Sequence, residues 1–277
     1  MFGNNYYTLV AGLREFALDS DTKGFDAKEI VSEILENVSS RDAAAVRLLY
    51  TWYDCENLVN FRNDRSAHND LGNLTREEIE AESARPSVLP KRVAAVVRAY
   101  ANPEGEDAET VDVNSRFERA LFAAYYDECA RSSSRFLREW SEFDRTLRNI
   151  VAAAVARQQS RPIDEVTVGG GDAVEQLQRS SAADFGLRGE YPFADAVITA
   201  VNDEQNILDK ERKVDAVRWN EADSLSAFNY FDIDAILAYL VKINMVARWS
   251  SLDERHGREM FERLLADLDG KDLINKQ

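Results

Sequence analysis

The sequence contains few of the side chains that most often carry out chemistry in proteins. Its 277 residues include two histidines, His68 and His256, and two cysteines, Cys55 and Cys129. These give few starting points for a metal centre or a histidine-based triad, and the cysteines lack zinc-site spacing. We therefore expect surface histidines, buried thiols in a reducing compartment, and no metal ion, cofactor or catalytic residue.

Motifs for bound phosphate and for a nucleophilic serine are also missing. The glycines at 169–171 are not followed by the Lys-Ser or Lys-Thr pair of a phosphate-binding loop. Neither a Gly-x-Gly-x-x-Gly run nor a Gly-x-Ser-x-Gly elbow is present. Carboxylates are numerous, however, so an enzyme with a carboxylate-lined cleft stays an alternative.

Long apolar runs are absent as well. The longest candidate, residues 150–156, is rich in alanine and far shorter than the ~20 residues that span a bilayer. Residues 1–5 lack the basic segment of a signal peptide. We expect no transmembrane segment and a cytoplasmic location.

The balance of charge is strongly acidic. Fifty Asp and Glu residues against 34 Lys and Arg give a formal net charge of -16. A phosphate-binding surface needs an excess of basic residues, so we expect no nucleic-acid partner. Basic partners, or the basic faces of an assembly, complement this charge.

Apolar residues recur at helical spacing along most of the chain, and almost no stretch alternates with the period of a strand. The sequence therefore predicts an all-α protein with no sheet of more than two short strands. The predicted helices cover residues 25–38, 43–61, 93–100, 172–180 and 193–219, together with long helices within 113–159 that meet at a joint at 132–134.

The segments between these helices carry their own signals. Thr75 and Glu78 have the spacing of a capping box, and we interpret the acidic run 77–82 as a solvated helix face rather than a cation site. Residues 160–171, with one proline and three glycines, predict a flexible connector. Residues 6–13 are too short a run to distinguish strand from helix.

The C-terminal stretch 231–268 predicts an antiparallel pair of helices. Its first helix begins after Asp232 and carries an apolar stripe that includes Asn244, which we expect to be hydrogen-bonded in a packed interface. Ser251 to Glu254 has the pattern of a capping box that opens the second helix, and the joint falls at Trp249 and Ser250.

One short pattern recurs along the chain. Tyr50-Thr-Trp-Tyr53-Asp54 is similar to Trp140-Ser-Glu-Phe143-Asp144, and Tyr239 begins a looser third copy. Chance similarity among amphipathic helices is the alternative to a repeated unit. If the repeat is real, residues 1–277 form a single all-helical unit built from three divergent parts, 1–73, 74–160 and 161–277.

The third copy carries a resemblance to a known family. The run Asp234-Ala-Ile-Leu-Ala-Tyr239-Leu-Val-Lys242, followed by Arg248, resembles the closing helix of the V/A-type ATPase family of stalk proteins named C, or d in eukaryotes. The N-terminal run 6–11 and the phrases Arg248-Trp249 and Gly257-Arg258 are more similar to a bacterial branch that is encoded beside V-type ATPase subunits.

The resemblance implies a function without chemistry. Members of the family are all-helical, contain three divergent copies of one unit, and act as non-catalytic central-stalk adaptors. They link the central shaft to the membrane rotor ring on the cytoplasmic side. The partners implied are therefore the central-shaft subunits and the rotor ring, and the alternative is a free-standing helical scaffold that binds another partner.

Four residues are candidates for a partner-binding surface: Tyr239, Lys242, Arg248 and Trp249. Lys242 and Arg248 place positive charge in the later turns of their helix, where they also stabilise the negative end of its dipole. Trp249 suits either an interface anchor or a hydrophobic staple. Docking and structural roles both stay open from the sequence.

Overall fold

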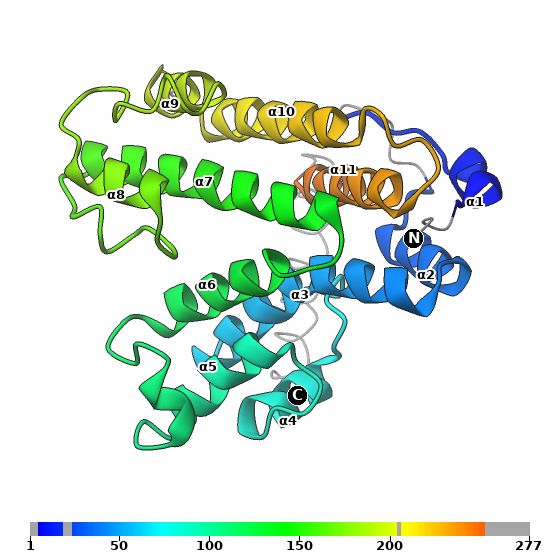
Figure 1. The fold of residues 1–277 in the computed structure, drawn as a ribbon, viewed down its shortest axis with the longest axis horizontal. Coiled ribbons are helices and arrows are strands. Elements are labelled where there is room, and N and C mark those ends of the chain that lie inside the picture. The colour runs from blue at the N-terminus through cyan, green and yellow to red at the C-terminus, as the bar shows by residue number, and fades with distance from the viewer. Residues whose placement is uncertain (1–4, 19–23, 204–205, 253–277) are drawn as a thin grey trace, which may run out of the picture.

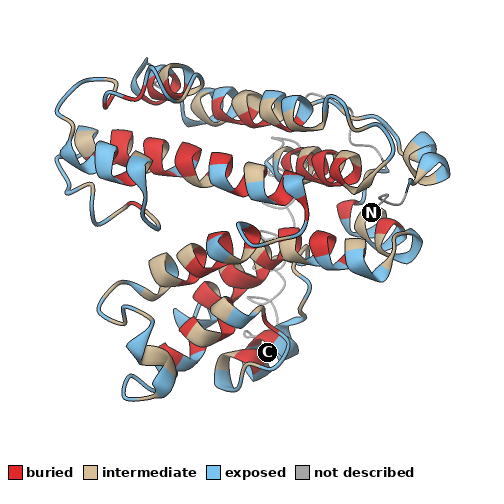
Figure 2. Cartoon of the chain, viewed as in Figure 1, coloured by how far each residue is buried: buried red, intermediate tan, exposed pale blue. Residues whose placement is uncertain are grey.

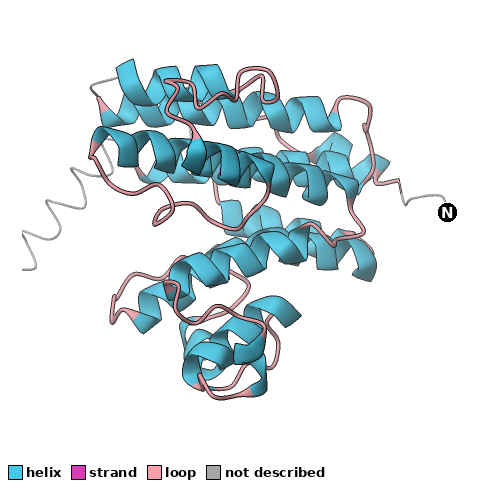
Figure 3. Ribbon diagram, turned by 60° about the vertical axis from the view of Figure 1, so that its left-hand side comes forward, coloured by secondary structure: helices cyan, strands magenta, loops and turns pink. Residues whose placement is uncertain are grey.

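The computed structural model describes residues 5–18, 24–203 and 206–252, and all regular structure within these ranges is helical (Figures 1 and 3). The all-α prediction is confirmed. None of the described helices is both long and apolar enough to cross a membrane. The α-helices are α1 Tyr7–Gly12, α2 Ala27–Asn37, α3 Ser40–Arg62, α4 Arg76–Ala84, α5 Lys91–Ala101, α6 Phe117–Cys129, α7 Arg135–Gln158, α8 Asp172–Arg179, α9 Ala194–Asp203, α10 Ile207–Ser226 and α11 Ile233–Ser251, with a 3-10 helix at Glu106–Glu109.

Short polar side chains start the helices that matter most for the arrangement. Ser134 accepts a hydrogen bond from the backbone N–H of Leu137 and begins α7, which confirms the joint predicted at residues 132–134. Asp232 accepts from two backbone N–H groups at the start of α11. Thr75 and Glu78 form the predicted capping box of α4.

The helices pack in layers around two hydrophobic cores. The larger core joins α2 and the first half of α3 to α7, α8, α9, α10 and α11. The smaller core joins the second half of α3 to α4, α5 and α6. In Figure 1, α9 and α10 lie above α7 and α11, and α3 lies below them. Figure 2 shows the buried residues gathered on the facing sides of these helices.

Helix α3 holds the two cores together because its ends bury different residues. Tyr50 belongs to the larger core and Leu58 to the smaller one. The predicted unit 74–160 likewise contributes α7 to the larger core and α4 to α6 to the smaller core. The division into three units at residues 73 and 160 stays a prediction.

Two helical predictions need correction at their boundaries. The stretch 193–219, predicted as one helix, forms α9 and α10 with a break after Asp203. Helix α11 continues through Trp249 and Ser250, so the predicted joint there is wrong, and Ser251 ends α11 by donating to the Arg248 carbonyl. The second helix of the predicted pair lies outside the described residues. Residues 7–12, left open from sequence, form the helix α1.

Two loop predictions also differ from the structure. Thr167 is fully buried within the segment predicted as a flexible connector, and the side-chain amide of Asn149 exchanges two hydrogen bonds with Val168. Glu82, predicted on a solvated face, is 4% exposed. Its carboxylate accepts from the backbone N–H groups that follow α4, and these bonds outweigh burial and lower its pKa.

Candidate functional site

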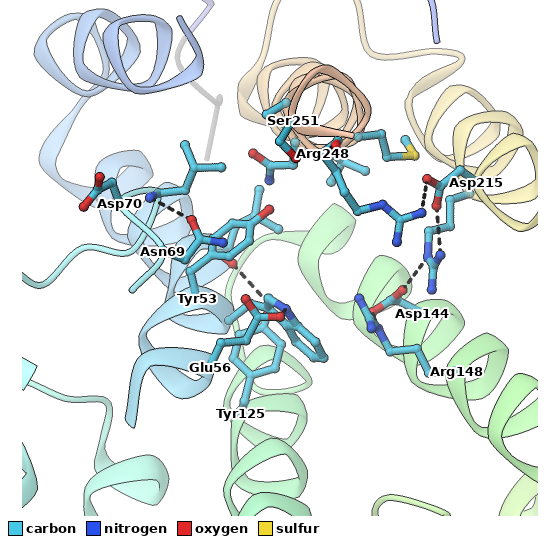
Figure 4. A pocket seen from close by; sticks show the side chains of 18 of the residues that line it. Tyr53, Glu56, Asn69, Asp70, Tyr125, Asp144, Arg148, Asp215, Arg248 and Ser251 are labelled. Carbon is cyan, nitrogen blue, oxygen red and sulfur yellow. Dashed lines mark hydrogen bonds and ion pairs between the residues drawn. The ribbon is translucent and has the colours of Figure 1, made fainter. Parts of the chain in front are cut away.

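A cavity of about 580 Å³ lies where the larger core meets α3 (Figure 4). Its wall combines aromatic, charged and amide side chains from α3, α6, α7, α10 and α11, and the loop 67–71 closes one side. The size and the mixed lining are typical of a small-molecule or partner pocket. The charged residues of this wall are ordered by a series of ion pairs.

Asp144, on α7, is the first centre of these pairs. Its carboxylate accepts from Nε of Arg148 at 2.8 Å, from Nε of Arg218 at 3.0 Å and from the Tyr126 hydroxyl at 2.8 Å. Burial alone raises the pKa of a carboxyl group, but the two guanidinium groups hold the pKa of Asp144 well below its ordinary value. Asp144 is therefore a buried and permanently ionised acceptor.

Asp215, on α10, is the second centre. Its carboxylate accepts from Nη1 of Arg218 at 2.9 Å, from Nη2 of Arg248 at 2.5 Å and from the indole N–H of Trp249 at 2.8 Å. Arg218 thus joins Asp144 to Asp215, and the pairs connect α7, α10 and α11. Removing one member of such a buried pair costs about 3–5 kcal/mol because it leaves an uncompensated charge.

The opposite wall of the cavity belongs to α3. The indole N–H of Trp52 donates to Glu56 at 3.0 Å, and the guanidinium carbon of Arg148 lies 4.0 Å from the centre of the Trp52 ring. Burial raises the pKa of Glu56. Burial also raises the pKa of the Tyr53 hydroxyl, so this wall faces the arginines with neutral aromatic groups and one carboxyl group.

The loop that closes the cavity is attached to α3 by two buried polar residues. The side-chain amide of Asn57 exchanges two hydrogen bonds with the backbone of Asn69, at 3.0 and 2.7 Å. The carboxylate of Asp54 accepts from the Asn73 side chain and from the Leu74 backbone. Burial raises the pKa of Asp54 to about 6, since amide donors offset less of the desolvation than a cation would.

The four predicted partner-binding residues all lie on α11 but do not converge. Arg248 and Trp249 meet at Asp215, and Arg248 also pairs with Glu211 at 3.0 Å. Lys242 pairs with Asp223 on α10, with its ammonium 4.9 Å from the centre of the Trp219 ring.

The fourth of these residues makes a different contact. The hydroxyl group of Tyr239 donates to the Arg14 carbonyl at 3.1 Å, and burial raises its pKa to about 12. Each of the four side chains thus has an intramolecular partner. A docking role for them stays a prediction.

Sequence reasoning identified one polar residue of α11 and missed the ion-pair network. Asn244 accepts from the Tyr50 hydroxyl at 2.9 Å, as expected for a polar residue in a packed interface. The spacing of Asp215 to Arg218 and of Asp144 to Arg148 places each pair on one helix face, which is the signal that indicates intrahelical pairs. Their joining across helices depends on tertiary packing.

The metal and histidine predictions have separate outcomes. No group of three His, Cys, Asp or Glu within the described ranges is arranged to hold a metal ion. His68, predicted at the surface, has a side chain that is 11% exposed and lines the cavity, with Nε2 3.9 Å from Asp70. His256 lies outside the described residues. Cys55 and Cys129 are buried free thiols, as predicted.

Comparison with known proteins gives a family and no function. A family model described as "Protein of unknown function (DUF2764)" matches residues 3–271. No curated protein and no solved structure matches the chain. The family match covers nearly the whole chain, so it includes both hydrophobic cores and every helix that lines the cavity.

Proposed function

The chain belongs to the DUF2764 family, and we propose that it is a non-catalytic central-stalk adaptor of a V/A-type rotary ATPase. In this role it links the central shaft to the membrane rotor ring and stays on the cytoplasmic side. The proposal rests on the resemblance in the Tyr239 to Arg248 segment and on how the three helices that carry the recurring pattern are arranged.

The arrangement of these helices is the observation that carries the proposal. The pattern lies on α3 at Tyr50, on α7 at Trp140 and on α11 at Tyr239, and α11 packs against both other helices. In the first two copies the aromatic pair is in ring contact and the following aspartate is buried. All three helices line the same cavity. Three related helices around one centre support a fold made of three divergent units.

The packing suits a part that transmits torque. The ion pairs of Asp144 and Asp215 tie α7, α10 and α11 together, while Asn57 and Asn149 hold the two long loops against α3 and α7. Close-packed interiors transmit strain because they deform little. A rigid helical body with fixed loops therefore supports an adaptor better than a hinged molecule would.

An exposed aromatic cluster supports contact with a protein partner. Phe228 and Tyr230 lie in the loop between α10 and α11 and are 91% and 68% exposed. Phe231, next along this loop, lies 4.6 Å from Tyr7 of α1, measured between ring centres. Exposed aromatic clusters often mark interaction surfaces. This end of the molecule is distinct from the cavity, so the chain offers two separate places for two partners.

The enzyme alternative has its specific test in the cavity, where carboxylates do converge. Asp144 and Asp215 are each saturated by three donors, and this leaves neither free to accept a proton from a substrate. Glu56 alone does not form an acid–base pair. These contacts favour a structural role for the carboxylates, and a free-standing scaffold stays the second candidate.

Binding to isolated ATPase subunits tests the proposal. Purified chain is mixed with the central-shaft subunits and, separately, with detergent-solubilised rotor ring, and complexes are measured by size-exclusion chromatography. We expect the wild-type chain to bind both. Failure to bind either one under conditions where shaft and ring remain folded contradicts the adaptor role and leaves the scaffold alternative.

Lys242→Ala separates docking from packing in that experiment. Asp223, its partner, is 57% exposed, so the lost pair costs only up to about 1 kcal/mol of stability. If Lys242 contacts a partner, the variant keeps its melting temperature and binds the shaft or the ring less tightly. Arg179→Ala, which removes an exposed pair on α8, is the matched control and should bind normally.

A further inference from the structure

The arginines of the cavity offer more hydrogen-bond donors than the protein itself uses. Within the described residues, the hydrogen bonds and ion pairs of Arg148 use only Nε, those of Arg218 leave Nη2 unused, and those of Arg248 leave Nε and Nη1 unused. A guanidinium group carries five N–H donors, so two carboxylates cannot satisfy three such groups. The surplus lies on the wall of a cavity of about 580 Å³.

We propose that this cavity binds a small phosphate ester with a hydroxylated body, and that the arginine wall takes its phosphate group. This site goes beyond the adaptor role and does not depend on it. Three features support the site: the fixed position of the donors, the number of oxygens they suit, and the acidic wall on the other side.

The donors are held in place before any ligand arrives. Asp144 and Asp215 alternate with the guanidinium groups in the order Arg148, Asp144, Arg218, Asp215, Arg248, with contacts of 2.5 to 3.0 Å. The two carboxylates are 8% and 2% exposed, which keeps them out of exchange with water. A ligand therefore meets arginines whose side-chain entropy has already been lost on folding.

The arrangement favours phosphate over smaller anions. Guanidinium groups donate in planar forks that match phosphate oxygens, and they reach this cavity from α7, α10 and α11. A tetrahedral phosphate presents three oxygens in different directions, whereas a carboxylate presents two in one plane. Three guanidinium groups from three helices can be satisfied by the first group more completely than by the second.

The opposite wall selects the rest of the ligand. Glu56, Asn69 and the Tyr53 hydroxyl face the arginines across the cavity (Figure 4). A carboxyl group there disfavours a second anionic end and accepts hydrogen bonds from hydroxyl groups. The volume exceeds that of phosphate alone, so the ligand class is a monophosphate whose uncharged body carries hydroxyl donors.

Calorimetric titration of the full chain tests the site. The probes are glucose 6-phosphate, adenosine 5′-monophosphate and inorganic phosphate, at low salt, with glucose and adenosine as uncharged controls. We expect saturable binding of at least one ester, weaker binding of inorganic phosphate, and none of the uncharged compounds. Absence of saturation with all three phosphates up to about 10 mM, which corresponds to a barely measurable affinity, overturns the proposal.

Substitutions locate the binding. Arg148→Gln should weaken ester binding at least about tenfold, and Arg248→Gln provides a second variant should the first fail to fold, as judged by circular dichroism. Arg135→Gln is the control, because Arg135 also forms an i,i+4 pair and its side chain is 46% exposed, against 45% for Arg148. Binding that survives both cavity variants, or that falls equally in the control, contradicts this site.

Discussion

Asp54 and Asp144 occupy matching positions in the recurring pattern, and the fold treats them in opposite ways. Each follows an aromatic pair on a long helix, and they are 2% and 6% exposed. Asp54 meets an amide side chain and a backbone N–H, and burial raises its pKa to about 6. Asp144 meets two arginines and a tyrosine hydroxyl, and its pKa falls despite burial.

The difference teaches that burial does not by itself decide the charge of a group. Desolvation raises the pKa of both carboxyl groups, and only cationic partners reverse the direction. Asp144 therefore serves the packing of α7 against α10 as a fixed charge. Asp54 holds the loop 69–74 with a charge that protonation near neutral pH removes.

The largest expected effect comes from neutralising Asp144. Asp144→Asn leaves Arg218 buried beside only Asp215, and we expect a loss of about 3–5 kcal/mol in the free energy of unfolding, measured with urea. Asp54→Asn at pH 7 is the matched control and should cost far less, because no buried cation loses its partner. Equal losses in the two variants would mean that the cationic partners do not distinguish the two sites.

A core substitution calibrates this charge effect against apolar packing. Leu240 of α11 is fully buried in the larger core, and Leu240→Ala should destabilise the chain by roughly 2–5 kcal/mol. The same urea titration measures it. A loss below about 1 kcal/mol would show that α11 packs more loosely than the contacts of Leu240 indicate.

Adding a methyl group beside Asp54 probes the loop attachment. A Cβ at Gly72 would lie 2.7 Å from Oδ1 of Asp54, the same oxygen that accepts from the Leu74 backbone. Gly72→Ala should therefore displace the carboxylate and cost about 1–3 kcal/mol. Gly170→Ala, at a loop position with open space around it, is the control and should be nearly neutral. An unchanged unfolding midpoint for Gly72→Ala would show that the loop yields freely.

The pH dependence of stability gives the smallest and most specific effect. With a folded pKa of about 6 and an ordinary value near 4, Asp54 binds more protons in the native state between these limits. Its contribution therefore favours folding at pH 4 and is lost as pH rises through 6, by on the order of 1–2 kcal/mol. Asp144 has the opposite sign and loses its contribution only below about pH 4.

Asp54→Asn isolates this titration. The variant should show a more positive dependence of unfolding free energy on pH between 4 and 6 than the wild type, since its side chain no longer titrates. Urea denaturation at several pH values measures the slope. Parallel curves for the two proteins would show that the Asp54 carboxyl group titrates at its ordinary pKa in the folded chain.

Much of the fold follows from local patterns, whereas the candidate site does not. Apolar spacing predicts α2, α3 and α7 because each presents one stripe to a core, and Ser134 and Thr75 mark helix starts through hydrogen bonds made within one turn. The break before α10 has no proline or glycine to announce it. The partners of Asp215 come from α10 and α11, up to 34 residues away, so only tertiary packing joins them.

The most direct test of the adaptor role is the composition of the ATPase that contains this chain. An affinity-tagged copy, expressed in its native host, is purified with its partners and quantified by mass spectrometry. We expect recovery of central-shaft and rotor-ring subunits in fixed proportion to the chain, and loss of assembled enzyme when the gene is deleted. Recovery of an intact, active ATPase from the deletion strain would contradict the adaptor role.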